Sequence, residues 1–343
     1  MAIAICAILA GANDWNAIEA FGNTKKDWFE RFLDLENGIP SHDTFSRLFS
    51  MLLPKAFQDF FFGWVKDIAG LVEGVIAIDG KTVRRSHDGI LGKKAIHMVS
   101  AWAVENRLVL GQVKTEEKSN EITAIPELLK VLDIKGCIVT IDAMGCQKSI
   151  VKKIIDGGGD YLLALKGNQG TLLDQVEEAF EQADNCGYEG YDFDYHKTEE
   201  KSRNRLETRR YWMLNIADTN VDTRAWLALT TIGMAESQRT IEGETSMEYR
   251  YYISSIENNA ELFANSSRAH WGIENSLHWQ LDMSFREDES RIRKGHSTEN
   301  FVVMRHVALN LLKNDKSTKL GVKNKRLKAG WDEGYLTKLL MSA

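Results

Sequence analysis

The sequence predicts an α/β fold in which helices flank a mixed β-sheet. From about residue 69 onward, apolar runs of β type alternate with segments of helical spacing, in the order strand, hairpin, helix, strand, helix, strand, helix. Strands that alternate with helices are typical of a parallel sheet covered on both faces, and the early hairpin adds an antiparallel component. From 187 to 258, Tyr, Trp, Thr and charged residues alternate. This is the order expected of an RNase H-like core with a β-rich insertion.

The N-terminal region, residues 1–68, reads as helical and is rich in Phe, Leu and Trp. Its pattern is interrupted at 37–41, where Ser41 or Asp43 is expected to cap the following helix by accepting a backbone N–H. The apolar run 1–12 starts without a cap. We therefore expect a buried helix and a truncated N-terminal region, which is a candidate for contacts with DNA ends.

The first part of the core is expected at 69–186. Its strands are predicted at 75–78, 95–104, 108–113, 137–141 and 160–165, with a tight hairpin at 105–107. Its helices are predicted at 121–132, 146–155 and 171–183. The β-rich insertion occupies 187–258, with strands near 209–214, 226–232 and 249–253. Core helices follow at 259–312, and a basic C-terminal tail at 313–343.

The composition excludes several classes of protein. The four cysteines show no CxxC spacing, which argues against a disulfide framework. The apolar N-terminal run is too short to span a bilayer. The net charge of −6 is not the bulk signature of a nucleic-acid binder. Charge is unevenly spread, however, with basic residues gathered between 313 and 328, a pattern that usually marks a solvated surface.

Two aspartates follow predicted strands. Asp79 ends the run IAID and Asp142 ends VTID. Ligands collect beyond the carboxyl ends of parallel strands, so the two carboxylates are expected close together. A third carboxylate would complete a site for two Mg²⁺ ions suited to phosphodiester cleavage. A single Asp-Gly at a strand end is more often a turn former, but two in this strand order are more specific.

Glu274 is the first candidate for the third acid. His270, Glu274 and His278 recur at i, i+4 and i+8, on one face of a continuous helix. A carboxylate buried on such an aromatic face is costly unless a cation meets it. Two alternatives remain: an amphipathic core helix with stacked His and Trp, or direct binding of zinc by the three residues. Asp282, two turns further on, is the reserve candidate.

At these motifs the chain resembles the DDE-type insertion-sequence transposases, and within them the H-repeat-associated subgroup. The resemblance covers nearly the whole chain. It rests on NGIPSHDTFSRLF (37–49), AIDGKTVRRS (77–86), EKSNEI (117–122), TIDAMGCQ (140–147), DYLLALKGNQ (160–169) and HWGIENSLHWQLDMSFREDESRIRKG (270–295).

The resemblance implies that Asp79, Asp142 and Glu274 form the catalytic, metal-binding triad of an RNase H-like DNA transposase. It implies Mg²⁺, with Mn²⁺ as a substitute, and no organic cofactor. It also implies cleavage at element ends and strand transfer into target DNA. The expected partners are double-stranded DNA and a second copy of the chain when DNA is bound. The expected location is the bacterial cytoplasm, at the nucleoid, with no membrane contact.

The chain departs from the family's Tyr-Arg-Glu-Lys signature, because His270 stands where Arg is usual and Leu281 where Lys is usual. We therefore expect other residues to contact DNA. The candidates follow the strand ends or flank the glutamate: Lys81, Arg84, Arg85, Lys148, Lys166, Asn168, Gln169, His270, His278, Arg291, Arg293 and Lys294. The alternatives to an active transposase are a catalytically inactive or repurposed DNA-binding relative, and a metal-dependent nuclease that nicks without joining.

Overall fold

The structure of the chain is a computed structural model that describes residues 1–87, 92, 94–115, 121–202 and 205–341. The chain divides into two compact units. Unit 1 comprises Met1–Leu71, Gly80–Lys118 and Ile273–Ala343, and unit 2 comprises Val72–Asp79 and Ser119–Gly272. The motif at 117–122 lies outside the described residues except for Glu121 and Ile122. The five sequence regions proposed above stay a prediction.

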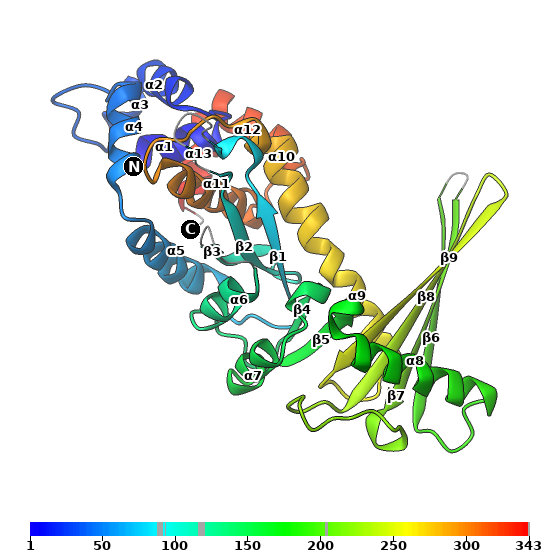
Figure 1. Cartoon of the computed structure of the whole chain (residues 1–343). Helices are drawn as coiled ribbons and strands as arrows, with labels where there is room; N and C mark the ends of the chain where they lie inside the picture. Colours follow the sequence, from blue (N-terminus) through cyan, green and yellow to red (C-terminus); the bar gives the residue numbers. More distant parts are fainter. Residues whose placement is uncertain (88–91, 93, 116–120, 203–204, 342–343) are drawn as a thin grey trace. The chain divides into compact units, whose positions relative to one another are not determined.

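Unit 2 is built on a mixed sheet (Figure 1). Its strands are hydrogen-bonded in the order β1 (Val75–Thr82, through residue 79), β4 (Ile138–Ile141), β5 (Asp160–Leu165), β9 (Glu244–Ser254), β8 (Thr231–Ile241), β7 (Arg205–Asn215) and β6 (Phe193–Ser202). The first three strands are parallel and the rest pair antiparallel. The parallel strands read as continuous apolar runs because both faces are covered.

The helices of unit 2 are α6 (Glu121–Leu129), α7 (Lys148–Asp156), α8 (Gly170–Asn185) and α9 (Ala260–Ile273), the last residue of which falls in unit 1. Helix α9 lies directly on the insertion strands. Phe263 packs edge-on against Tyr211 and Tyr252, and a Cβ added to Gly233 would lie 2.9 Å from the Phe263 ring. The absence of a side chain at Gly233 therefore permits this close approach.

Unit 1 contains a hairpin of β2 (His97–Ala103) and β3 (Leu108–Lys114), next to which the last residues of β1 lie. Its N-terminal helices are α1 (Ala2–Leu9), α2 (Trp15–Thr24), α3 (Lys26–Phe29), α4 (His42–Met51) and α5 (Pro54–Ala69). After a π-helical turn (Glu274–His278), its C-terminal helices are α10 (Trp279–Phe285), α11 (Ser297–Asn314), α12 (Val322–Trp331) and α13 (Glu333–Met341). Helix α11 is buried on all sides and forms the centre of this unit.

The predicted α/β class and the RNase H-like strand order are confirmed. β1 lies beside both the antiparallel β2–β3 hairpin and the parallel strand β4, and β5 follows β4 in the order. Ser41 is the predicted cap of α4, accepting the Thr44 N–H at 3.3 Å.

Several element predictions were wrong in detail. Strand β1 runs on to Thr82 instead of ending before Asp79, because the chain stays paired on the hairpin side, where the Val83 N–H donates to the Ile96 carbonyl at 3.0 Å. Trp226 lies outside the insertion strands, which are longer than predicted. The basic run at 313–328 is not all solvated surface, because Lys325 and Arg326 are buried within the helical unit.

None of the helices within the described residues is both long and apolar enough to cross a membrane.

Candidate active site

The structure brings Asp79 and Asp142 together on neighbouring parallel strands of unit 2. Ile78 is in register with Ile141, and each aspartate is the next residue of its chain: Asp79 continues β1, whereas Asp142 follows the end of β4 and begins a turn. Neighbouring strands lie about 4.8 Å apart, so the two aspartates follow adjacent positions of the sheet. Both aspartates are partly exposed, whereas the strand residues before them are buried. The edge of the sheet therefore presents two adjacent carboxylates to solvent.

The carboxylate of Asp142 is held in a turn. Its Oδ1 accepts the Gly145 N–H at 3.2 Å and caps the short helix Ala143–Gly145. Burial raises the pKa of Asp142, and repulsion from Glu121 raises it further, against the N–H groups of Gly145 and Met144 and the attraction of Lys166. A bound cation would offset both raising effects. Two hard carboxylate donors at this edge fit a divalent metal such as Mg²⁺.

Two amides after β5 fix that turn. The Asn168 side chain donates to the Ala143 carbonyl at 2.8 Å, and the Gln169 side chain donates to the Cys146 carbonyl at 2.9 Å. Both residues were predicted to contact DNA, and that contact stays a prediction. In the structure, the side-chain amides of these two residues support the loop that carries Asp142.

Glu274 is the first residue of the π-helical turn, in unit 1, and its side chain is exposed. The expectation of a buried carboxylate was wrong. The expectation of a regular helix was also wrong, since a π-helical turn holds more residues than an α-helical turn and shifts those after it around the axis. His278, partly buried at the end of this turn, therefore does not keep the spacing that would place it on the face of His270.

The chain just before Glu274 is anchored in unit 2. The His270 Nδ1 lies 3.1 Å from the hydroxyl of Thr140, two residues before Asp142. Burial lowers the pKa of His270 to about 4, so the ring is neutral at pH 7. His270, predicted to contact DNA, thus has a structural partner on β4, and its contact with DNA stays a prediction.

The chain after Glu274 is anchored in unit 1 by Lys81, two residues beyond Asp79. The Lys81 ammonium lies 2.7 Å from Asp282, 3.1 Å from Asp288 and 3.6 Å from Glu287. Burial by itself lowers the pKa of Lys81, but these carboxylates raise it above its ordinary value. Asp282, the reserve candidate for the third acid, is therefore engaged by a cation of the protein, which favours Glu274 for that role.

Further predicted DNA contacts lie in unit 1. Arg84 and Arg85 are exposed; Arg84 lies 3.3 Å from Asp288, and the Arg85 carbonyl accepts the Arg293 Nε–H at 2.9 Å. Arg291, Arg293 and Lys294 line a groove together with residues of the N-terminal helical region, among them Asn13, Asp14, Trp15, His42 and Asp43. Their gathering was not foreseen, because it depends on the packing of distant segments.

Two more predicted contacts lie in unit 2. Lys166 and Lys148 are both exposed, and the Lys148 ammonium lies 5.9 Å from the centre of the Trp226 ring.

Within the parts of the chain that the structure describes, no group of three or more His, Cys, Asp or Glu side chains is gathered to hold a metal ion. Neither Asp79, Asp142 and Glu274 nor His270, Glu274 and His278, the zinc alternative, forms such a group. Glu121, which acts on the pKa of Asp142, lies in the EKSNEI motif (117–122) and was not among the predicted site residues.

Comparison with known proteins gave family matches and near relatives. The family described as Transposase DDE domain matches residues 70–311, and the family described as DDE_Tnp_1-associated matches residues 1–65. "H repeat-associated putative transposase YhhI" of Escherichia coli (strain K12) is 45% identical, over 98% of this chain and 90% of that protein. "Putative transposase YncI" of Escherichia coli O157:H7 is 46% identical, over 99% and 88%.

A solved structure of the piggyBac transposase synaptic complex with hairpin DNA also matches, at 10% sequence identity and a TM-score of 0.45. The match covers 98% of this chain and 71% of that chain.

Proposed function

The chain belongs to the DDE transposase family, and on that premise we propose that it cleaves phosphodiester bonds at the ends of a mobile element and transfers the freed strand to target DNA. The observation that carries this proposal is that Asp79 and Asp142 directly follow Ile78 and Ile141, which are paired in register on adjacent parallel strands. Each is a hard oxygen donor at a sheet edge where phosphate-binding ions are commonly held.

Glu274 completes the triad in this proposal. Support comes from the two anchors on either side of it in the chain. Four residues before it, His270 contacts Thr140 on the strand that leads to Asp142. Eight residues after it, Asp282 pairs with Lys81 on the strand that carries Asp79. The first anchor is on β4, which ends directly before Asp142, and the second is on β1, which carries Asp79. Both contacts support the proposal that the three acids share a site.

Asp79, Asp142 and Glu274 would hold Mg²⁺, or Mn²⁺ in its place, and no organic cofactor takes part. When bound, such ions polarise the scissile phosphate and favour the attacking oxygen. The chain's own residues fix the geometry: Asn168, Gln169 and the Gly145 N–H hold the Asp142 turn. The neutral ring of His270, through its contact with Thr140, fixes the chain four residues before Glu274 and adds no charge there.

Exposed cations would bind the phosphates of the DNA duplex. We assign this role to the exposed basic residues at the sheet edge and around the groove, namely Arg84, Arg85, Lys148, Lys166, Arg291 and Lys294, and to the partly exposed Arg293. Phosphate contacts supply most sequence-independent affinity. Joining two element ends calls for two copies of the chain on DNA. The cell compartment in this proposal is the bacterial cytoplasm, at the nucleoid.

The test is cleavage of a labelled duplex that carries the DNA flanking the chain's own gene, with Mg²⁺ or Mn²⁺. The wild-type chain is expected to cut at the element end and to join the freed 3′ end to a second duplex. Cutting without joining would favour a related nuclease. Absence of both, in a chain that binds the duplex, would contradict the proposal.

One second candidate has an observation in its favour. Glu274 is exposed, and the described residues hold no ready group of three ligands. Both features would be expected of a catalytically inactive DNA-binding relative. It predicts the same binding by wild type and by Glu274→Gln, with no cleavage by either.

A further inference from the structure

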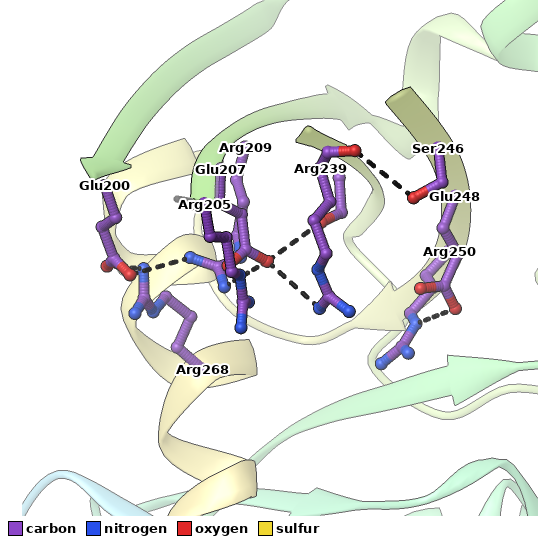
Figure 2. Close-up of polar contacts among 10 residues, drawn as sticks. Glu200, Arg205, Glu207, Arg209, Arg239, Ser246, Glu248, Arg250 and Arg268 are labelled. Atoms are coloured by element: carbon purple, nitrogen blue, oxygen red, sulfur yellow. Dashed lines mark hydrogen bonds and ion pairs between the residues drawn. The ribbon is translucent and has the colours of Figure 1, made fainter. Parts of the chain in front are cut away.

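The insertion strands of unit 2 carry a network of arginines on the face that α9 packs against (Figure 2). At its centre is Glu207, whose side chain is only 4% exposed. Arg205, Arg209 and Arg239 all pair with this one carboxylate, Arg209 at 2.6 Å and Arg239 at 3.4 Å. Burial by itself raises the pKa of Glu207, but the three guanidinium groups lower it below its ordinary value. The carboxylate is thus ionised and fixed.

A second carboxylate extends the network toward α9. Glu200 lies 3.4 Å from Arg209 and 2.5 Å from Arg268, which Figure 2 shows reaching across from the helix. We call Arg205, Arg209, Arg239 and Arg268 the arginine cluster. Its four cations are met by two carboxylates, so the cluster keeps a surplus of two positive charges. This surplus stands out on a chain whose net charge is −6.

The arginines are positioned but not covered. The side chains of Arg205, Arg239 and Arg268 remain 42%, 46% and 39% exposed. A guanidinium carries five N–H donors in a rigid fork, so a pairing with one carboxylate leaves donors directed to solvent. Because the buried Glu207 already fixes the side chains, little rotamer entropy is lost when a second anion binds.

We propose that the arginine cluster is a binding surface for the phosphodiester backbone of duplex DNA, an inference that rests on the proposed function and extends it to the insertion strands. Fixed forks with spare donors suit bidentate contact with phosphate oxygens. The contact is to the backbone, so it carries no base preference. DNA is favoured over an acidic protein because the proposed reaction already brings a duplex to this chain.

The test is the salt dependence of binding to a labelled duplex, measured for Arg205→Ala/Arg239→Ala. Each lost phosphate contact lowers the slope of log affinity against log salt by about 0.9, so the double variant is expected to lose about 1.8. The matched control is Lys197→Ala/Lys201→Ala, which removes two charges from the opposite face of the same sheet. The control is expected to keep the slope nearer to that of wild type.

A variant that misfolds would be uninformative, so Arg205→Gln/Arg239→Gln is the second form. Gln keeps a donor for Glu207 and removes the charge, and it is expected to lower the slope equally. If the wild-type chain binds duplex DNA but either folded variant keeps the wild-type slope, this inference is overturned and the proposed function stands. If the wild-type chain binds no duplex, both fall.

Discussion

The surroundings of the Asp142 carboxylate disfavour its ionised form. Burial and Glu121 raise its pKa, whereas the backbone N–H groups of Gly145 and Met144 and the attraction of Lys166 act to lower it. Asp79 follows Ile78, the residue paired in register with the Ile141 that precedes Asp142. Two adjacent carboxylates contribute little to packing and repel each other, but a cation bound between them would stabilise both charges.

The sequence could place both aspartates directly after apolar runs, because local pattern is sufficient for that, and their role as metal ligands stays a prediction. It predicted the exposure of Glu274 wrongly. That prediction treated the chain from His270 to His278 as one continuous helix, whereas it forms a π-helical turn at Glu274–His278. No local pattern reports such a turn.

Replacing one member of the triad should abolish cleavage and leave DNA binding in place. Asp79→Asn, Asp142→Asn and Glu274→Gln are each expected to lower the cleavage rate by roughly 10³-fold or more, since a lost metal ligand removes several kcal/mol of transition-state stabilisation. Asp156→Asn, at an exposed carboxylate at the end of α7, is the matched control. A triad variant that cuts as fast as this control removes its residue from the site.

His306 makes stability depend on pH. It is buried in α11, and burial, together with His278, Arg305 and Lys81, lowers its pKa to about 3. In the unfolded state His306 binds a proton near pH 6.5, whereas in the folded state its ring stays neutral down to about pH 3. The free energy of unfolding should therefore decrease as the pH falls from 6.5 toward 3. In denaturant unfolding, the free energy of unfolding of His306→Leu should change with pH by about 1.4 kcal/mol per pH unit less than that of the wild-type chain. Equal slopes would show that the buried ring does not govern acid stability.

At the scale of elements, the turn after β4 decides where the Asp142 carboxylate points. The Ala143–Gly145 turn is held from one side by Asp142 itself and from the other by Asn168 and Gln169. Gly145 sits against the strand that it follows, because a Cβ there would lie 2.2 Å from the Ile141 side chain. The turn therefore has little freedom to shift.

Gly145→Ala should displace this turn. Forcing a methyl group against Ile141 is expected to destabilise the chain by about 1–3 kcal/mol and to reduce cleavage by more than the loss of folded protein explains. Gly167→Ala is the matched control, since a Cβ there meets nothing within 4 Å. Unfolding curves and cleavage rates should separate the two; identical behaviour would mean that the turn adjusts freely.

The order of elements could be predicted because strands and helices show their own periodicities. Element ends could not. Strand β1 passes Asp79 because its pairing continues on the hairpin side as far as Val83 and Ile96, residues whose meeting depends on tertiary structure. Likewise, the Lys81 contacts with Asp282, Glu287 and Asp288 join positions about 200 residues apart, which no spacing rule connects.

Across the whole molecule, positive charge is concentrated in local groups that the negative net charge does not reveal. The surplus of the arginine cluster and the basic groove residues coexist with a net charge of −6. Some basic residues serve the fold instead. Arg326, in the predicted C-terminal tail, donates to the carbonyls of Ile8 at 2.7 Å and Ala12 at 3.0 Å, which ties α12 to the end of α1.

Arg326→Ala should therefore act on stability and not on DNA binding. The change leaves buried carbonyl groups without their donor, so a loss of about 3 kcal/mol in the free energy of unfolding is expected. Lys323→Ala, at an exposed position of the same helix, should change it little. Denaturant unfolding measures both, and equal stability of the two variants would return the 313–343 segment to the role of a solvated tail.

The proposed function requires Asp79, Asp142 and Glu274 to share one metal site. Iron-directed cleavage of the protein backbone tests it most directly: Fe²⁺ replaces Mg²⁺, ascorbate and peroxide generate radicals at the ion, and the cut positions are sequenced. A shared metal site predicts cuts close to residues 79, 142 and 274 together, suppressed by excess Mg²⁺ and lost in Asp142→Asn. Cuts near the two aspartates without any near Glu274, or no metal-dependent cuts, would contradict it.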